Sequence, residues 1–239
     1  MIEIRPAGDT GWLVSLGRAA RPDAVTVRRV RRLKGRVDRA ALPGVIETHV
    51  GYRSLLVSYD PVAVNPGIVR DGLDRIAAEE AADADPAQGS GGRVKRFALC
   101  TCPACATDRD SISRLTGLGW DEVVRRYCAV TFEVWVMGFQ PGCPFLGPVP
   151  GELNLPRLDA PRVRVPAGSV GIGGWQTGIY ASPSPSGWRL LGRTPAVLFD
   201  PRRNPPNRLA VGDRVVFEPS ADHVGLHGGA TLFRKEVSR

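Results

Sequence analysis

Residues 139–200 constrain the fold more than any other part of the chain. Glycine or proline recurs every few residues there, yet large apolar and aromatic side chains lie between them. A disordered linker would lack those side chains, so the pattern is typical of short strands joined by tight turns. Strand signals continue about every 8–12 residues to Glu218, which predicts a closed or nearly closed β-barrel. Glycines in such strands expose the backbone and can line a concave pocket.

The length of 239 residues and the hydrophobic content of 43% suffice for one large domain or two ordinary ones. No apolar run approaches the roughly 18 residues that cross a bilayer. The first twelve residues carry charges where a signal peptide would have an apolar core. We therefore expect a cytoplasmic protein without a membrane partner.

The net charge of +8 raises the question of nucleic-acid binding. Seven basic residues lie between Arg28 and Arg39, but no aromatic residue is interleaved with them and no zinc-finger or helix-turn-helix pattern accompanies them. The run favours a solvated helix face, and no nucleic-acid partner is expected.

The first 80 residues predict a small α+β sandwich domain. Strands are expected at residues 2–6, 12–16, 45–50 and 54–59. A helix is expected at 22–34, with Pro22 in its first turn, and another at 66–82. The side chains expected to face inward from these helices are Val25, Val27, Val30, Leu33, Ile68, Leu73 and Ile76.

Residues 81–93 lack large apolar side chains and are expected to form a linker. Residues 94–239 then form the second domain, the barrel. Strands are expected at 94–99, 130–137 and 229–234. Helices are expected at 113–118 and 120–128, the second with an apolar face made by Trp120, Val123, Val124 and Tyr127.

The segment from Gly138 to Gly147 reads GFQPGCPFLG and resembles the GFxPGFPYLGG signature of one bacterial family. Further family segments follow in order: Pro156-Arg157-Leu158, Pro161-Arg162, Val165–Val170, Gly174–Tyr180, Gly187-Trp188, Gly192–Pro195, Leu198–Asp200 and Gly212-Asp213. On these motifs the chain is identified as a member of the family of 5-oxoprolinase B subunits. The same family is known as allophanate hydrolase subunit 1 and as the Kip-type sporulation-kinase inhibitor.

This resemblance implies an α+β N-terminal domain followed by a cyclophilin-like β-barrel. It also implies a heteromer with a barrel-fold partner, the C subunit, that opens 5-oxoproline to glutamate or acts on allophanate. The substrate would be a small amide or lactam carboxylate. ATP with Mg²⁺ is expected to be shared with the partner, and the chain alone is expected to be inactive. Two alternatives stay open: a non-catalytic inhibitor of a sensor histidine kinase and, on fold analogy alone, a peptidyl-prolyl isomerase.

The chain also departs from the family pattern. Tyr127-Cys128 stands where the family usually has His-Ser, and Cys143 replaces a phenylalanine of the signature. A Gly-Pro-Asp-Leu run usual in the family is replaced by residues 100–110, which contain three cysteines. If the missing histidine is catalytic, the activity or the substrate of this member is altered.

A pocket for a lactam carboxylate needs an amide partner, a cation and an apolar wall. Gln176 and Arg193 are the predicted catalytic residues, because an amide both donates and accepts and a guanidinium can fork onto an anion. The predicted substrate- or anion-binding residues are Phe139, Phe145, Arg157, Arg162, Gly168, Ser169, Thr177 and Tyr180. Structural alternatives are a buried amide at Gln176 and an ion pair of Arg193 with Asp200 or Asp213.

Gly168-Ser169 and the glycine-rich segment Gly171–Gly174 can bring backbone N–H groups against an anion. No P-loop pattern and no lysine occurs there, and strand bulges are the alternative role for these glycines.

The five cysteines are odd in number and three are clustered, which favours reduced thiols over a disulfide framework. Cys100, Cys102 and Cys105 form C-x-C-x-x-C, and a metal would need a fourth ligand such as Cys128, Cys143, His223 or His227. Because paired C-x-x-C motifs are absent, fortuitous thiols are favoured and no metal is expected in the chain.

Overall fold

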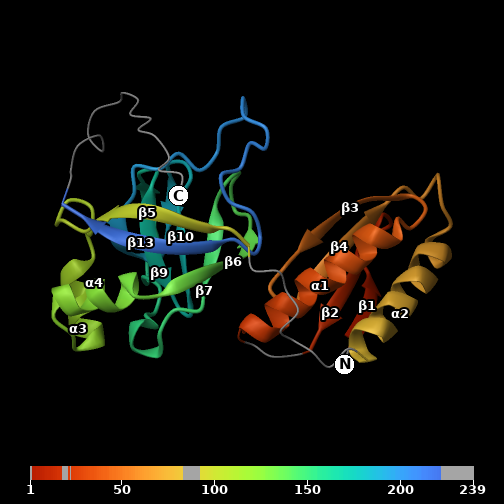
Figure 1. The fold of residues 1–239 in the computed structure, drawn as a ribbon, viewed down its shortest axis with the longest axis horizontal. Helices are drawn as coiled ribbons and strands as arrows, with labels where there is room; N and C mark the ends of the chain where they lie inside the picture. Colours follow the sequence, from red (N-terminus) through yellow and green to blue (C-terminus); the bar gives the residue numbers. More distant parts are fainter. Residues whose placement is uncertain (1, 18–20, 22, 83–91, 222–239) are drawn as a thin grey trace. The chain divides into compact units, whose positions relative to one another are not determined.

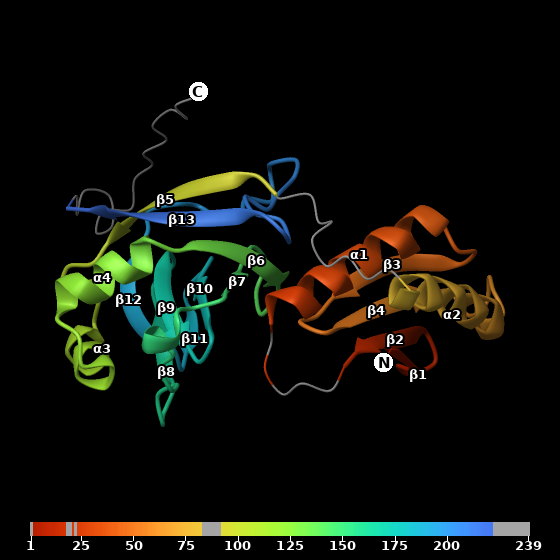
Figure 2. The ribbon, with the colours of Figure 1, turned by 60° about the horizontal axis from the view of Figure 1, so that its bottom comes forward.

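The computed structural model describes residues 2–17, 21, 23–82 and 92–221 (Figures 1 and 2). The chain divides into two units, Met1–Gly91 and Gly92–Arg239. Most of the predicted linker at 81–93 lies outside the described residues, and so do the predicted strand at 229–234, Pro22, His223 and His227.

The N-terminal unit is a four-stranded antiparallel sheet with two helices, which confirms the predicted α+β sandwich. Its elements are β1 (Ile2–Pro6), β2 (Gly11–Leu16), α1 (Ala24–Ala40), β3 (Val45–Val50), β4 (Ser54–Tyr59) and α2 (Pro66–Ala82). The strand order is β1-β2-β4-β3, and the two helices pack against each other on one face of the sheet (Figure 1). Val14, Leu55 and Val57 of the sheet form the core with the apolar stripes of both helices.

Helix α1 begins after Asp23, whose carboxylate accepts the Thr26 N–H at 2.8 Å as an N-cap. Two details differ from the predicted helices. The apolar stripe of α1 continues to Val37, so the helix ends six residues later than predicted. Val25 is exposed, because it lies about 200° around the helix from the buried Val27. In α2 Ile68 is exposed and Val69 is buried in its place.

Part of the basic run packs between the two helices instead of forming a wholly solvated face. Glu80 of α2 is fully buried, and both its oxygens accept from the Arg32 guanidinium, at 2.6 and 2.7 Å. Arg29 and Arg36 lie 3.4 and 3.5 Å from the same carboxylate. A buried carboxylate with this many guanidinium groups around it is compensated for the loss of water.

The C-terminal unit contains a closed seven-stranded barrel in the order β10-β7-β6-β13-β5-β12-β9, which confirms the predicted barrel. The barrel strands are β5 (Val94–Cys100), β6 (Thr131–Met137), β7 (Pro144–Gly147), β9 (Ser169–Gly173), β10 (Gln176–Ile179), β12 (Arg189–Arg193) and β13 (Arg214–Ser220). Neighbouring strands are antiparallel except β13 and β5. A separate pair, β8 (Arg162–Val165) and β11 (Ser184–Ser186), and a short 3₁₀ helix, η1 (Gly151–Leu153), complete the unit.

Helices α3 (Arg109–Thr116) and α4 (Trp120–Cys128) lie together at one end of the barrel (Figure 2). Helix α3 begins four residues before the predicted start, because Asp108 is anchored there by the Leu190 N–H at 2.6 Å and by Arg162. It ends at Thr116 and is followed by Gly117 as C-cap, whose φ of 70° suits glycine. All four residues of the predicted apolar face of α4 are buried. Within the described residues, no helix has both the length and the apolar character needed to cross a membrane.

Tyr127 of α4 lies inside the barrel, fully buried. Its ring contacts Phe132 and Phe217 at centroid distances of 4.9 and 5.3 Å. Its hydroxyl donates to Thr177 Oγ1 at 2.6 Å, and Thr177 in turn donates to the Gly171 carbonyl at 2.8 Å. Burial raises the pKa of Tyr127, and burial raises the pKa of the neighbouring Cys128 thiol to about 11. Neither side chain ionises near neutral pH, so neither takes the place of a histidine as a proton acceptor.

Candidate functional site

Three glycines leave part of the outer face of β9 and β10 without side chains. Val170, Ile172, Thr177 and Ile179 point into the barrel, so Gly171, Gly173 and Gly178 alternate to the outside. A Cβ at Gly173 would lie 2.5 Å from Cδ1 and Nε1 of the Trp188 indole, and one at Gly178 would lie 3.1 Å from Cζ3. The indole therefore lies directly on the backbone of these two strands, and at Gly173 the distance is one that only glycine permits.

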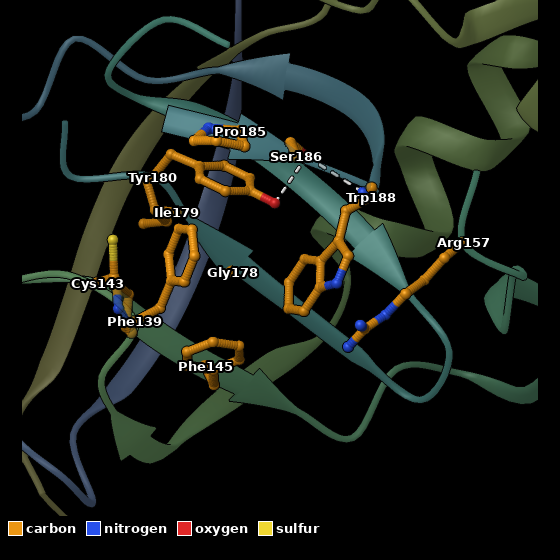
Figure 3. A pocket seen from close by; sticks show the side chains of 12 residues that line it. Phe139, Cys143, Phe145, Arg157, Gly178, Ile179, Tyr180, Pro185, Ser186 and Trp188 are labelled. Carbon is orange, nitrogen blue, oxygen red and sulfur yellow. Dashed lines mark hydrogen bonds between the residues drawn. The ribbon is translucent and has the colours of Figure 1, made fainter. Parts of the chain in front are cut away.

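Aromatic rings surround a hollow on this face (Figure 3). Phe145 of β7 meets Trp188 edge to face with centroids 5.5 Å apart, and Tyr180 meets Trp188 and Phe139 at 6.3 Å each. The hollow has a volume of about 580 Å³, which includes open solvent at its mouth. Its lining consists of Phe139, Cys143, Pro144, Phe145, Arg157, Gly178, Ile179, Tyr180, Pro185, Ser186, Gly187 and Trp188.

One cation and two neutral polar groups lie in this mostly apolar lining. The Arg157 guanidinium carbon is 6.0 Å from the centre of the Trp188 ring. Ser186 Oγ bonds the Tyr180 hydroxyl at 2.7 Å and accepts the backbone N–H of Trp188 at 3.1 Å, so it holds the Tyr180 ring and the backbone that carries Trp188. Burial raises the pKa of Tyr180 and keeps the phenol neutral. The described lining contains no carboxylate, so the pocket favours a small anion with an apolar body.

The signature loop forms one side of the pocket under backbone constraint. Phe139 has a φ of 68°, which is unfavourable for a side chain of its size, and it is 63% exposed. Gly142, with a φ of 80°, lies against Phe199, where a Cβ would be 2.6 Å from Phe199 Cβ. Cys143 Sγ accepts the Ala181 N–H at 3.2 Å, and burial raises the pKa of this thiol. The constraint holds an exposed aromatic ring at the mouth of the hollow.

The structure brings four of the predicted binding residues together in the lining: Phe139, Phe145, Arg157 and Tyr180. Arg162 lies elsewhere, because its guanidinium pairs with Asp108 and donates to the Trp188 carbonyl at 3.3 Å. It anchors the chain that carries the pocket residue Trp188. Thr177 is fully buried inside the barrel with its hydroxyl bonded on both sides.

The proposed anion contacts of Gly168 and Ser169 are used within the chain. The Gly168 N–H donates to the Tyr180 carbonyl at 2.7 Å, and the Ser169 N–H donates to the Pro166 carbonyl at 3.2 Å. Gly168, with a φ of 81°, allows a close approach, since a Cβ there would lie 2.1 Å from the Thr194 carbonyl oxygen. These two N–H groups are therefore not directed at a ligand.

The two predicted catalytic residues lie outside the described pocket lining. Gln176 is buried on β10, on the same outer face as Gly178 by strand alternation. Arg193 of β12 is half-buried and donates from Nε to the Ala167 carbonyl at 2.8 Å. Asp200, suggested as its ion-pair partner, pairs with Arg202, and Asp213 accepts the Arg93 and Ala210 N–H groups. The catalytic roles of Gln176 and Arg193 stay predictions.

Sequence reasoning missed Trp188, Ser186 and the pocket role of Cys143. The signal for Trp188 was the alternation of glycines at 171, 173 and 178 across two adjacent strands. Such a bare stripe leaves room for one large ring, and Gly187-Trp188 follows close behind in the chain. Ser186 carries no comparable sequence signal.

Residues 2–209 match the family described as carboxyltransferase domain, subdomain C and D. The chain is 36% identical over 200 residues to the B subunit of 5-oxoprolinase from Escherichia coli O157:H7, covering 82% of this chain and 87% of that one. It is 30% identical over 221 residues to the corresponding 5-oxoprolinase B subunit of Bacillus subtilis strain 168, covering 90% and 91%. The chain belongs to the family of 5-oxoprolinase B subunits.

A solved structure extends this family relationship to the fold. The crystal structure of TTHA0988 is similar with a TM-score of 0.75 and 30% identity, over 92% of this chain. The match covers 40% of TTHA0988, so this chain spans less than half of that protein's length. The names of both 5-oxoprolinase relatives describe part of an enzyme and neither refers to kinase inhibition, so the comparison does not favour the inhibitor alternative.

Replacing Gly173 by alanine should displace the Trp188 indole, because the new methyl group would overlap the ring. We expect a loss of about 1–3 kcal/mol in the free energy of unfolding and an altered near-ultraviolet circular dichroism signal. Gly138→Ala is the matched control, since a Cβ there meets no atom within 4 Å. Equal behaviour of the two variants would show that the ring does not rest on Gly173.

Proposed function

We propose that this chain is the B subunit of an ATP-dependent complex of the 5-oxoprolinase type and works with a partner, the C subunit. The aromatic pocket of the barrel holds the substrate, a small lactam or acyl-urea carboxylate. The observation that carries the proposal is the single guanidinium of Arg157 beside Trp188, in a described lining without a carboxylate. Family membership supports the reaction type.

The chemistry of the lining fits the two parts of such a substrate. Arg157 can offer parallel N–H donors to a carboxylate. Phe145 and Trp188 provide an apolar wall for the ring or the chain of the substrate and exclude water from one side of it. Ser186 fixes the Tyr180 ring and the backbone of Trp188 before a ligand arrives, so little conformational freedom is lost there on binding.

The nucleotide is assigned to a site shared with the partner. Mg²⁺ prefers oxygen ligands, above all carboxylates and phosphates, and the described pocket lining supplies no carboxylate. The pocket therefore fits the organic anion and not the metal ion. We propose that Mg²⁺ with ATP is held outside this pocket, together with the partner.

Replacing Arg157 by alanine should raise the KM for 5-oxoproline in the reconstituted complex by about 10–100-fold, because a hydrogen-bonded charge worth about 1.5–3 kcal/mol is lost. The measurement is 5-oxoproline-dependent ATP hydrolysis. Arg164→Ala, which removes an exposed arginine of β8, is the control and should leave KM unchanged. An unchanged KM in the Arg157 variant would show that the substrate carboxylate does not bind at Arg157.

Gln176→Ala and Arg193→Ala should each abolish turnover by the complex without unfolding the chain, if these residues act on the reacting amide. The same ATP hydrolysis assay measures turnover, with circular dichroism as the folding control. The purified chain alone should hydrolyse nothing, because the partner completes the site. Wild-type turnover in either variant would exclude that residue, and robust turnover by the single chain would contradict the shared site.

A further inference from the structure

Three cysteine sulfurs meet at one end of the barrel. Cys100 is the last residue of β5, and Cys102 and Cys105 follow in the turn that leads to α3. The three Sγ atoms all lie within 4.8 Å of one another. Each is a thiol and not half of a disulfide. The three cysteines that are close in the sequence are thus also close in space.

The turn that carries these thiols is well defined by backbone hydrogen bonds. The N–H groups of Cys105 and Ala106 both donate to the Cys102 carbonyl, at 2.9 and 2.8 Å. Cys100 is fixed by strand pairing, opposite Arg193 of β12 and beside Ser220 of β13. The sulfur positions therefore do not depend on a flexible loop, and a ligand would find them already gathered.

The arrangement has the exposure that a metal site with an entry path requires. Cys100 and Cys105 are buried, 2% and 5% exposed, whereas Cys102 is half-buried at the rim. The two buried sulfurs can shield a bound ion from water, and the half-buried Cys102 leaves a path by which the ion can enter. Zinc–sulfur bonds of about 2.3 Å place tetrahedral sulfurs about 3.8 Å apart, so the cluster needs to contract by about 1 Å at most.

We propose that Cys100, Cys102 and Cys105 bind one thiophilic d¹⁰ metal ion, Zn²⁺ or Cu⁺, as three thiolates. Soft sulfur ligands select these ions over Mg²⁺ or Ca²⁺. The thiol protons pass to the buffer, and no electron is transferred. Zn²⁺ would keep a fourth position for water, whereas Cu⁺ is satisfied by three sulfurs. This proposal replaces the expectation from sequence that the thiols are fortuitous.

The test uses the full-length protein, reduced and freed of metal under anaerobic conditions. Co²⁺ is titrated as a spectroscopic probe for the Zn²⁺ arm, and Cu⁺ is titrated against a chromogenic chelator for the other. We expect one ion per chain, thiolate-to-Co²⁺ charge-transfer absorption in the near ultraviolet, and displacement of Co²⁺ by Zn²⁺. Tight binding of Cu⁺ with no Co²⁺ signal would assign the site to copper.

Variants identify the ligands. Cys100→Ser, Cys102→Ser and Cys105→Ser should each weaken binding at least about tenfold, and Cys128→Ser is the matched control that should bind as wild type. Because a core serine can disturb folding, alkylation of the wild-type protein followed by mass spectrometry gives a second reading. The bound ion should protect these three cysteines and leave Cys128 equally reactive with and without metal.

Three results would overturn the proposal. The first is binding of neither ion at micromolar concentration. The second is binding that survives the Cys102→Ser substitution, at the most exposed of the three sulfurs. The third is a reduced protein that takes up no ion while mild oxidation links two of the three sulfurs, which would make the cluster a redox pair instead.

Discussion

The contact between the Trp188 indole and the bare backbone of β9 and β10 determines the shape of the site. A methyl group at Gly173 would push the ring away, and with it the edge-to-face contacts to Phe145 and Tyr180, whereas one at Gly178 would overlap the Pro144 carbonyl oxygen. Glycine in a strand costs about 0.5–1 kcal/mol relative to alanine. That cost is offset by burial of a large ring, which is 7% exposed.

The same two strands are held from the inner side of the barrel. Tyr127 donates to Thr177, and Thr177 donates to the carbonyl of Gly171, a residue that lies against the Cβ of Trp188. The residue pair that departs from the family pattern thus begins with a core side chain that supports the pocket floor. The geometry of the floor is thus supported from inside the barrel by a neutral phenol.

The sequence predicted most elements because their signals are local. The strands at 45–50 and 54–59 and the helix at 66–82 have the predicted bounds, and the closed barrel follows from short strands separated by turns. The family motifs also located Phe139, Phe145, Arg157 and Tyr180, which the fold gathers into one lining. The spacing of the glycines indicates where the floor of the pocket lies, but it does not identify the ring that lies on that floor.

The remaining site predictions depended on partners far away in the chain. Arg162 is paired with Asp108, 54 residues earlier, and no local sequence pattern predicts that ion pair. The Gly168 N–H donates to the carbonyl of Tyr180, which follows β10, so its partner could not be read from the local sequence; the acceptor of the Ser169 N–H, Pro166, is by contrast a local one. The three cysteines are close in sequence and are gathered by a local turn, while pairing with β12 and β13 fixes Cys100 at its start.

A crystal structure of the reconstituted complex with 5-oxoproline tests the central claim most directly. The account predicts ligand density against the Trp188 indole, with the carboxylate in hydrogen-bond contact with Arg157. Density for the ligand at another place, with this pocket empty and Trp188 still lying on its glycines, would contradict it.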